Sequence, residues 1–280
     1  PVFLKQGEGR PGPQVVVTTQ PNLEAVNGLQ LTSPEIIART PAKPHQIQIQ
    51  SWQTPKGATV MFVNAPEIPM LDLRVVFNAG SARDEGTPGL ASLTNAMLSE
   101  GAGVADVDQI ARHFEGLGAS LDNGAYRDMA VVSLRTLSDP TYRQPALSLF
   151  YDVVAHPTFP QDSLDRLRKQ LLLALEHEKQ DPSSQASKAF FENLYPEAPY
   201  GIPTNGTEES LPLITTSLLR DFHQRHYVSR NMVIAMIGAI DRKDAELIAL
   251  QLDAQLPEGS SAPALPVPAP LAKAVEQHIE

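Results

Sequence analysis

Apolar and polar residues follow two kinds of pattern along the chain, and the first kind predicts strands. Alternation with a period of two, rich in Val, Ile and Phe, predicts strands at four places: 59–63, 71–78, 129–134 and 232–237. The segment 71–78 is the clearest of them. Leu71, Leu73, Val75 and Phe77 fall on one face of it, because successive side chains of a strand point to opposite sides.

The second pattern spaces apolar residues three and four apart and predicts helices. These are expected at 87–99, 107–117, 142–154, from about 162 onward, 184–194, 215–226 and 245–252. Thr87 is a favourable N-cap with Pro88 in the first helical position, so the first helix is expected to begin there. The long helix from 162 places five leucines on its core stripe: Leu164, Leu167, Leu171, Leu172 and Leu175. Strands grouped in hairpins and helices in clusters favour an α+β fold.

Proline-rich stretches lie on both sides of this patterned region. Residues 1–45 are rich in Pro, Gln and Thr, which predicts an extended N-terminal arm. Residues 46–256 form the expected compact domain. Residues 257–270 have the composition of a semi-rigid linker, and the alternation at 271–280 is typical of a strand that begins a second, truncated domain.

Composition narrows the possible functions. The chain of 280 residues has 42% hydrophobic residues, which is ordinary for a globular protein, and no Cys, which excludes thiolate zinc sites and cysteine nucleophiles. Its net charge of −10, without a long acidic run, argues against a nucleic-acid partner. No stretch approaches eighteen consecutive apolar residues, so no transmembrane segment is expected.

Four short motifs occur in order between about residues 55 and 255. They are Phe77 to Ala91, with a Gly-Ser loop before a helix; Glu115 to Asn123; Phe159-Pro160 with the long helix to Pro182; and Tyr227 to Ile234, followed by Gly238. Together they resemble the landmarks of the pitrilysin/insulinase-type zinc peptidases, with Ser229 where Pro is usual. The resemblance implies an antiparallel-rich sheet with helices packed mainly on one face.

In active members of that family the first helix carries the zinc motif His-x-x-Glu-His. The two His supply imidazoles to zinc, the Glu acts as general base, and a second Glu on the long helix completes the ligand set. The resemblance aligns Gly89-Leu90-Ala91 with the family's Gly-Leu-Ala and puts Ser92, Asn95 and Ala96 at the His, Glu and His positions. Counting back from Pro182 puts Ala174 at the position of the second Glu.

None of these four residues suits the chemistry of its position. Ala96 and Ala174 have no lone pair, and Ser92 is a poor zinc ligand beside imidazole or carboxylate. Asn95 cannot act as a general base, because an amide has no useful proton affinity near neutrality. A shifted alignment finds no substitute, since no His lies between residues 45 and 113. The resemblance therefore implies a degenerate site, with no metal and no catalysis by this chain alone.

Other polar residues are weaker candidates for chemistry. His223 and His226 form a His-x-x-His pair on a predicted helix, but two ligands do not complete a zinc site. The remaining candidates are more typical of solvated, capping or loop positions: Glu176-His177-Glu178, His113 with Glu115, Ser81, Ser99 and Asp84-Glu85. The single Trp52 is expected to pack in the core or at an edge.

Members of the family work as pairs of similar units, one with zinc and one degenerate. The resemblance therefore implies a processing-peptidase-like heterodimer, in which this chain is the non-catalytic subunit and a homologous catalytic peptidase subunit holds the zinc. Extended peptides would bind by strand addition to a sheet edge. The family's peptide-anchoring residues belong to its second half, so none is assigned here. The Pro-rich arm at a start without Met favours an exported, periplasmic protein. The alternatives are a scaffold subunit with no role in proteolysis, or a hydrolase using an unrelated site.

Overall fold

The computed structural model describes residues 47–277, apart from Glu197 and Ala272. The chain divides into two units, 1–46 and 47–280. The N-terminal arm expected at 1–45 falls in the first unit and so lies outside the described residues.

A mixed six-stranded sheet is the centre of the described unit. Its strands are β1 (Gln50–Gln53), β2 (Thr59–Asn64), β3 (Met70–Phe77), β6 (Ser120–Ala125), β7 (Ala130–Leu137) and β8 (Met232–Gly238). They lie in the order β1-β2-β8-β3-β7-β6. Only β2 and β8 pair in parallel, whereas the other four pairings are antiparallel. A second, two-stranded sheet joins β4 (Gly101–Ala102) to β5 (Ala105–Asp106). The antiparallel-rich α+β fold expected from the resemblance is confirmed.

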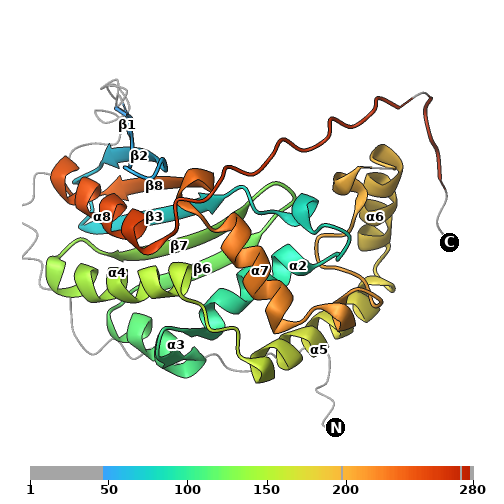
Figure 1. The fold of residues 1–280 in the computed structure, drawn as a ribbon, viewed down its shortest axis with the longest axis horizontal. Coiled ribbons are helices and arrows are strands. Elements are labelled where there is room, and N and C mark those ends of the chain that lie inside the picture. Colours follow the sequence, from blue (N-terminus) through green and yellow to red (C-terminus); the bar gives the residue numbers. More distant parts are fainter. Residues whose placement is uncertain (1–46, 197, 272, 278–280) are drawn as a thin grey trace, which may run out of the picture. The chain divides into compact units, whose positions relative to one another are not determined.

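Helices cover one face of the large sheet. The described helices are α2 (Leu90–Ala96), α3 (Val107–Gly116), α4 (Pro140–Ala155), α5 (Gln161–Glu178), α6 (Pro182–Leu194), α7 (Thr216–His226) and α8 (Arg242–Gln255). In Figure 1, α4 and α8 lie in front of the strands. Burial alternates accordingly: Leu73 and Met236 are buried against the helices, whereas Arg74 and Ile237 are exposed on the other face. None of the described helices is long and apolar enough to cross a bilayer.

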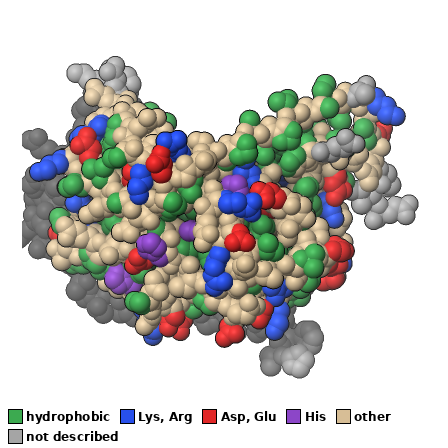
Figure 2. Space-filling view, in the orientation of Figure 1, with side chains coloured by type: hydrophobic (Ala, Val, Ile, Leu, Met, Phe, Trp, Pro, Cys, Tyr) green, Lys and Arg blue, Asp and Glu red, His purple; other side chains and the backbone are tan. Residues whose placement is uncertain are grey.

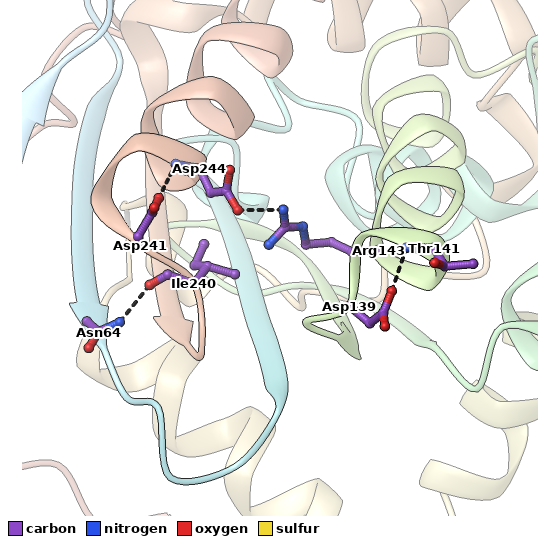
Figure 3. Close-up of polar contacts among 7 residues, drawn as sticks. All are labelled: Asn64, Asp139, Thr141, Arg143, Ile240, Asp241 and Asp244. Atoms are coloured by element: carbon purple, nitrogen blue, oxygen red, sulfur yellow. Dashed lines mark hydrogen bonds and ion pairs between the residues drawn. The ribbon is translucent and has the colours of Figure 1, made fainter.

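Two of the covering helices begin with an aspartate cap. The Asp139 carboxylate accepts from the Thr141 N–H at the start of α4, and the Asp241 carboxylate accepts from the Asp244 N–H at the start of α8 (Figure 3). The Arg143 guanidinium, nearly buried, then donates to the Asp244 carboxylate at 2.6 Å and ties the two helices together. The capping residues thus fix where both helices start and how they meet.

The first helix begins later than the sequence suggests. Thr87 is not its N-cap: α2 starts at Leu90, after Gly89, whose φ of 91° is left-handed. The helix then tightens to a 3₁₀ turn at Met97–Glu100. The strand expected to begin at 271–280 is also absent from its described part, since 273–277 has no regular structure and no described strand lies beside it.

Strand β6 has no counterpart among the strands predicted from the sequence. Asp122, Asn123 and Gly124 are poor strand formers, so the segment lacks the alternation that marks the other strands. Pairing with β7 along its whole length places it as a strand. It is the last strand of the sheet, and no described strand pairs with its outer edge.

Candidate functional site

The start of α2 is held by a carboxylate from the preceding loop. Asp84 accepts hydrogen bonds from the N–H groups of Gly89 and Ala91, both at 2.8 Å. Burial raises the pKa of Asp84 to about 7, although these two N–H donors act in the opposite direction. The expectation that Asp84 is a capping residue is therefore confirmed, with the cap reaching α2 from five residues upstream.

The loop around residues 204–210, more than a hundred residues later in the chain, packs on the same helix. The Ser92 hydroxyl donates to the Thr204 carbonyl at 2.7 Å, and the Ser210 hydroxyl donates to the Pro88 carbonyl at 2.7 Å. A Cβ added at Gly89 would stand 2.9 Å from the Cα of Gly206, closer than real Cβ atoms approach. The loop and the helix start therefore fit each other only because both positions are glycine.

Asn95 lies at the centre of a buried hydrogen-bond network. Asn95 is only 1% exposed. The side-chain amide donates to the Val131 carbonyl at 3.2 Å and to the Tyr227 hydroxyl at 3.3 Å. The Asn123 amide in turn donates to the Asn95 backbone carbonyl at 2.5 Å and to its side-chain oxygen at 3.3 Å. Asn95 thus joins α2 to β6, β7 and the end of α7.

Tyr227 completes this network from the other side. Its ring lies 4.6 Å from the ring of Phe77 and stacks at 4.7 Å on the imidazole of His223. Complete burial raises the pKa of the Tyr227 hydroxyl, which stays protonated. Among the described residues, Asn95 is the hydrogen-bond partner of this hydroxyl.

The two alanines occupy different helices. Ala96 is half-buried at the end of α2, one turn after Ser92, while Ala174 is exposed on α5. Leu175 of α5 lines a cavity of about 190 Å³ together with Thr204, the residue that accepts the Ser92 hydroxyl. The fold therefore brings Ser92, Asn95 and Ala96 together on α2, and it places the C-terminal half of α5 beside the loop that contacts them.

These side chains do not fit a zinc ion. The Ser92 hydroxyl and the Asn95 amide are already engaged within the protein, and neither alanine carries a donor atom. Within residues 47–277 as described, no group of three His, Cys, Asp or Glu side chains is placed to share a metal ion.

The two histidines of α7 pack in the interior. The His223 imidazole hydrogen-bonds the Val154 carbonyl at 2.9 Å, and the His226 ring lies 4.5 Å from the ring of Phe222 without a polar partner in the described structure. Burial lowers the pKa of each to about 4, so both are neutral near pH 7. They have different neighbours and do not converge on one point.

The remaining candidates have the local roles that their positions suggest. Glu176 is exposed and pairs with Lys179, and His113 contacts the Pro145 carbonyl at 3.1 Å near the end of α3. Glu85 forms an exposed ion pair with Arg225 at 2.5 Å. The others lack a catalytic neighbour among the described contacts: Ser81, Ser99, Glu115, His177 and Glu178. Trp52 lies on edge strand β1 under the guanidinium of Arg242, at 3.5 Å.

Sequence reasoning did not identify Asn123, Tyr227 or Arg127 as individual contributors. Asn123 and Tyr227 lie within the family-like motifs, which were the available signal for them. Arg127 lies outside those motifs. Its guanidinium stacks on Phe191 at 3.5 Å and donates to the Tyr200 carbonyl at 3.1 Å, which attaches α6 to the β6–β7 hairpin.

Comparisons with known proteins agree with this geometry. Residues 59–208 match the family described as insulinase (peptidase family M16). A curated relative from Rickettsia bellii, named an uncharacterized zinc protease, is 22% identical over 204 residues, which are 72% of this chain and 49% of that protein. The chain thus spans about half the length of the curated relatives it matches.

Solved structures show the same fold. A peptidase M16 inactive domain from Pseudomonas fluorescens is 49% identical with a TM-score of 0.78, covering 79% of this chain and 54% of that one. The first half of the periplasmic protease PqqL from Escherichia coli is 21% identical with a TM-score of 0.72, covering 80% of this chain and 49% of that one. The second likeness supports the fold alone.

Proposed function

Because the chain belongs to peptidase family M16, the insulinase family, we propose that it is a non-catalytic subunit that binds extended peptides beside a homologous, zinc-bearing subunit. The observation that carries the proposal is the state of α2. Its Ser92 and Asn95 side chains are used to hold the domain together, and Ala96 has no donor atom. The likeness to a domain described as inactive points the same way.

The outer edge of β6 is the proposed place for the peptide. The Tyr126 N–H donates to the Met129 carbonyl across the β6–β7 hairpin. Backbone groups of an antiparallel strand alternate between its two neighbours, so the N–H of Ala125 points away from β7. The N–H groups of Asn123 and Leu121 also point away from β7. A peptide strand added there would run past α2, which packs against β6.

One experiment tests peptide binding and the partner together. A family member that carries an intact His-x-x-Glu-His motif is first isolated as a partner that co-purifies with this chain from the native source. The two purified proteins are then mixed. A quenched fluorescent peptide is then assayed. Cleavage is expected in the mixture, with none by this chain alone. Peptide cleavage by the isolated chain with stoichiometric zinc would contradict the proposal.

A matched pair of substitutions tests the β6 edge. Ala125→Pro removes the outward N–H, whereas Ala125→Val keeps it and suits a strand. We expect Ala125→Pro to lower cleavage in the mixture at least tenfold and Ala125→Val to leave it nearly unchanged. Equal activity of the two variants would exclude strand addition at this position.

The proposal extends to location and to cofactor use. Two of the similar structures are of a periplasmic protease, which supports a periplasmic location for this chain. Zinc is assigned to the partner and not to this chain. The scaffold alternative predicts a different pull-down result: stable partners of other kinds, without a subunit that carries the zinc motif. The alternative of an unrelated hydrolase site predicts zinc that is lost on replacing His223.

A further inference from the structure

The segment that follows α8 is hydrogen-bonded to the 3₁₀ turn Ser229–Asn231, just before β8, although the segment itself forms no helix or strand. The Pro257 carbonyl accepts from the Ser229 N–H at 2.9 Å, and the Glu258 carbonyl accepts from the Arg230 N–H at 3.0 Å. A Cβ added at Gly259, whose φ is +64°, would stand 2.4 Å from the Cβ of Val228. In Figure 1 the segment leaves α8 as an extended trace toward α6.

Two side chains of the body then hold the next residues by their backbone. The Asn231 side-chain oxygen accepts from the N–H of Ala262 at 3.1 Å. The Arg83 guanidinium donates through Nη1 to the carbonyl of Pro263 at 2.9 Å. The domain thus recognises an N–H and the carbonyl of the following proline. Figure 2 shows apolar side chains along this segment above the body of the protein.

These two side chains are positioned by the domain itself. The Arg83 residue is 7% exposed, and its Nε and Nη2 both donate to the Asn78 side-chain oxygen, at 3.0 and 2.8 Å. The Asn231 amide donates to the carbonyls of Asn78 and His226, at 3.1 and 2.8 Å. Asn78, Arg83 and Asn231, called the clasp below, are therefore held by hydrogen bonds within the domain to which the segment does not contribute.

A cavity of about 540 Å³ lies between the clasp and this segment. Its other described walls come from the sheet, the β6–β7 hairpin and the loop after α6: Val76, Phe77, Asp128, Met129, Tyr200 and Val233. The segment contributes one wall, from Ala262 to Leu265. None of the residues from Ser261 to Pro266 is fully buried. The segment therefore fills its site only partly and is released at low cost.

The sequence of the held segment defines what the site accepts. Pro263-Ala264-Leu265-Pro266 is a Pro-x-x-Pro unit. Proline fixes φ near the extended range and has no N–H, so such a segment cannot join the sheet as an inner strand, but it presents carbonyls for donors such as Arg83. A groove with an arginine, a tyrosine and apolar walls suits this ligand.

We propose that the clasp and its cavity form a docking site for proline-rich extended segments, which Ala262–Leu265 occupies in cis and which a proline-rich segment of a partner protein enters by exchange. This site is separate from the β6 edge and does not depend on the proposed function. Because the segment in cis acts at a high effective concentration, a free peptide competes weakly until the hold in cis is loosened.

Peptide binding to a loosened chain tests the proposal. Ala262→Pro in the full chain removes the N–H that Asn231 accepts. A synthetic peptide with the sequence of residues 259–268 is titrated into this variant and followed by NMR. We expect saturable binding, at least tenfold weaker for the matched peptide that carries the Ala262→Pro change itself. Adding Arg83→Gln to the chain should abolish binding of both peptides.

Amide exchange of the full chain gives a second test that needs no peptide. Arg83→Gln is expected to speed exchange of the Ala262 N–H, which donates to Asn231, at least tenfold. Arg135→Gln, which removes an exposed arginine paired with Asp72, should leave it unchanged. The proposal is overturned if the two peptides bind the loosened chain equally, if Arg83→Gln does not weaken binding, or if both arginine variants exchange alike.

Discussion

Asn95 connects α2, β6, β7 and Tyr227 through one amide side chain and its own carbonyl. The resemblance puts Asn95 at the family's general-base position, and an amide there supplies both a donor and an acceptor without a charge. A carboxylate there would face the acceptor oxygen of the Val131 carbonyl in a buried setting, which is costly for an ion. The residue is therefore suited to holding the domain together.

Replacing Asn95 by Ala should lower stability strongly. The change leaves the Tyr227 hydroxyl without its described partner and removes one hydrogen bond from the Val131 carbonyl, while the Asn123 amide keeps its bond to the backbone carbonyl of residue 95. A buried polar group left unpaired costs roughly 1–3 kcal/mol. We expect the free energy of unfolding in urea to fall by about 2–4 kcal/mol. Ser92→Ala serves as the matched comparison. It removes one hydrogen bond of a half-buried hydroxyl and should lower the free energy of unfolding by about 1 kcal/mol. A smaller loss for Asn95→Ala than for Ser92→Ala would contradict this assignment.

The buried histidines make stability depend on pH. The pKa of His226 is lowered to about 4 by burial and by Arg225 and Arg83, with Glu85 acting oppositely, whereas an unfolded His has a pKa near 6.5. The unfolded chain therefore binds more protons between these values, and the free energy of unfolding should fall as pH drops from about 6.5 to 4. The lowered pKa of His223 adds to this fall.

Denaturation in urea across this pH range measures the effect. His226→Met should make the fall shallower, while His113→Gln, at an exposed position, should not. The raised pKa of Asp84 works in the opposite direction, because the folded state holds its proton longer than the unfolded state. Identical pH profiles for His226→Met and the unchanged chain would contradict the account.

At the scale of helices and strands, local sequence patterns predict most helices correctly. They fail where contacts with residues outside the element determine the structure. The apolar spacing at 142–154 and the Leu stripe of α5 are visible in the sequence, and both helices form, with α4 beginning two residues earlier, at Pro140. The start of α2 lies later than predicted, because the Asp84 carboxylate caps it from the preceding loop and Gly89 takes a left-handed φ where it packs on Gly206, far along the chain. Strand β6 was missed because pairing with β7 overrides the low strand propensity of Asp122 and Gly124.

The candidate site also depends on contacts that the local sequence does not encode. The four positions on α2 and α5 were found by resemblance, because their side chains carry no chemical signal of their own. The bonds of Ser92 and Asn95 to Thr204, Val131 and Tyr227 join residues 36 to 132 positions apart. No local pattern encodes such contacts.

The fit between α2 and its loop makes Gly89 sensitive to change. Gly89→Ala places a Cβ at φ 91° and 2.9 Å from the Cα of Gly206, so strain and overlap add. We expect a loss of about 2–4 kcal/mol in the free energy of unfolding. Gly116→Ala is the matched control, since Gly116 lies in α3 with open space around it, and it should stabilise by about 0.4–1 kcal/mol. Equal effects of the two changes would show that α2 and its loop are loosely packed.

At the largest scale, the described unit is an M16-type domain in which the sheet, the covering helices and the chain order resemble those of similar structures. Within that frame, α2 has the packing role that Asn95 and Ser92 give it. The clasp adds a second feature, since it holds a proline-rich segment beside the β6–β7 hairpin. Peptide binding at β6 and segment binding at the clasp are separate proposals with separate variants.

Zinc binding tests the central claim most directly. Equilibrium dialysis measures the zinc bound by the unchanged chain and by a triple variant with Ser92→His, Ala96→His and Ala174→Glu. This variant puts the family's three ligands at the positions that the resemblance assigns and leaves Asn95 in place. The account predicts no zinc retained at this site by the unchanged chain and one equivalent by the triple variant. One equivalent of zinc in the unchanged chain, or none in a folded triple variant, would contradict it.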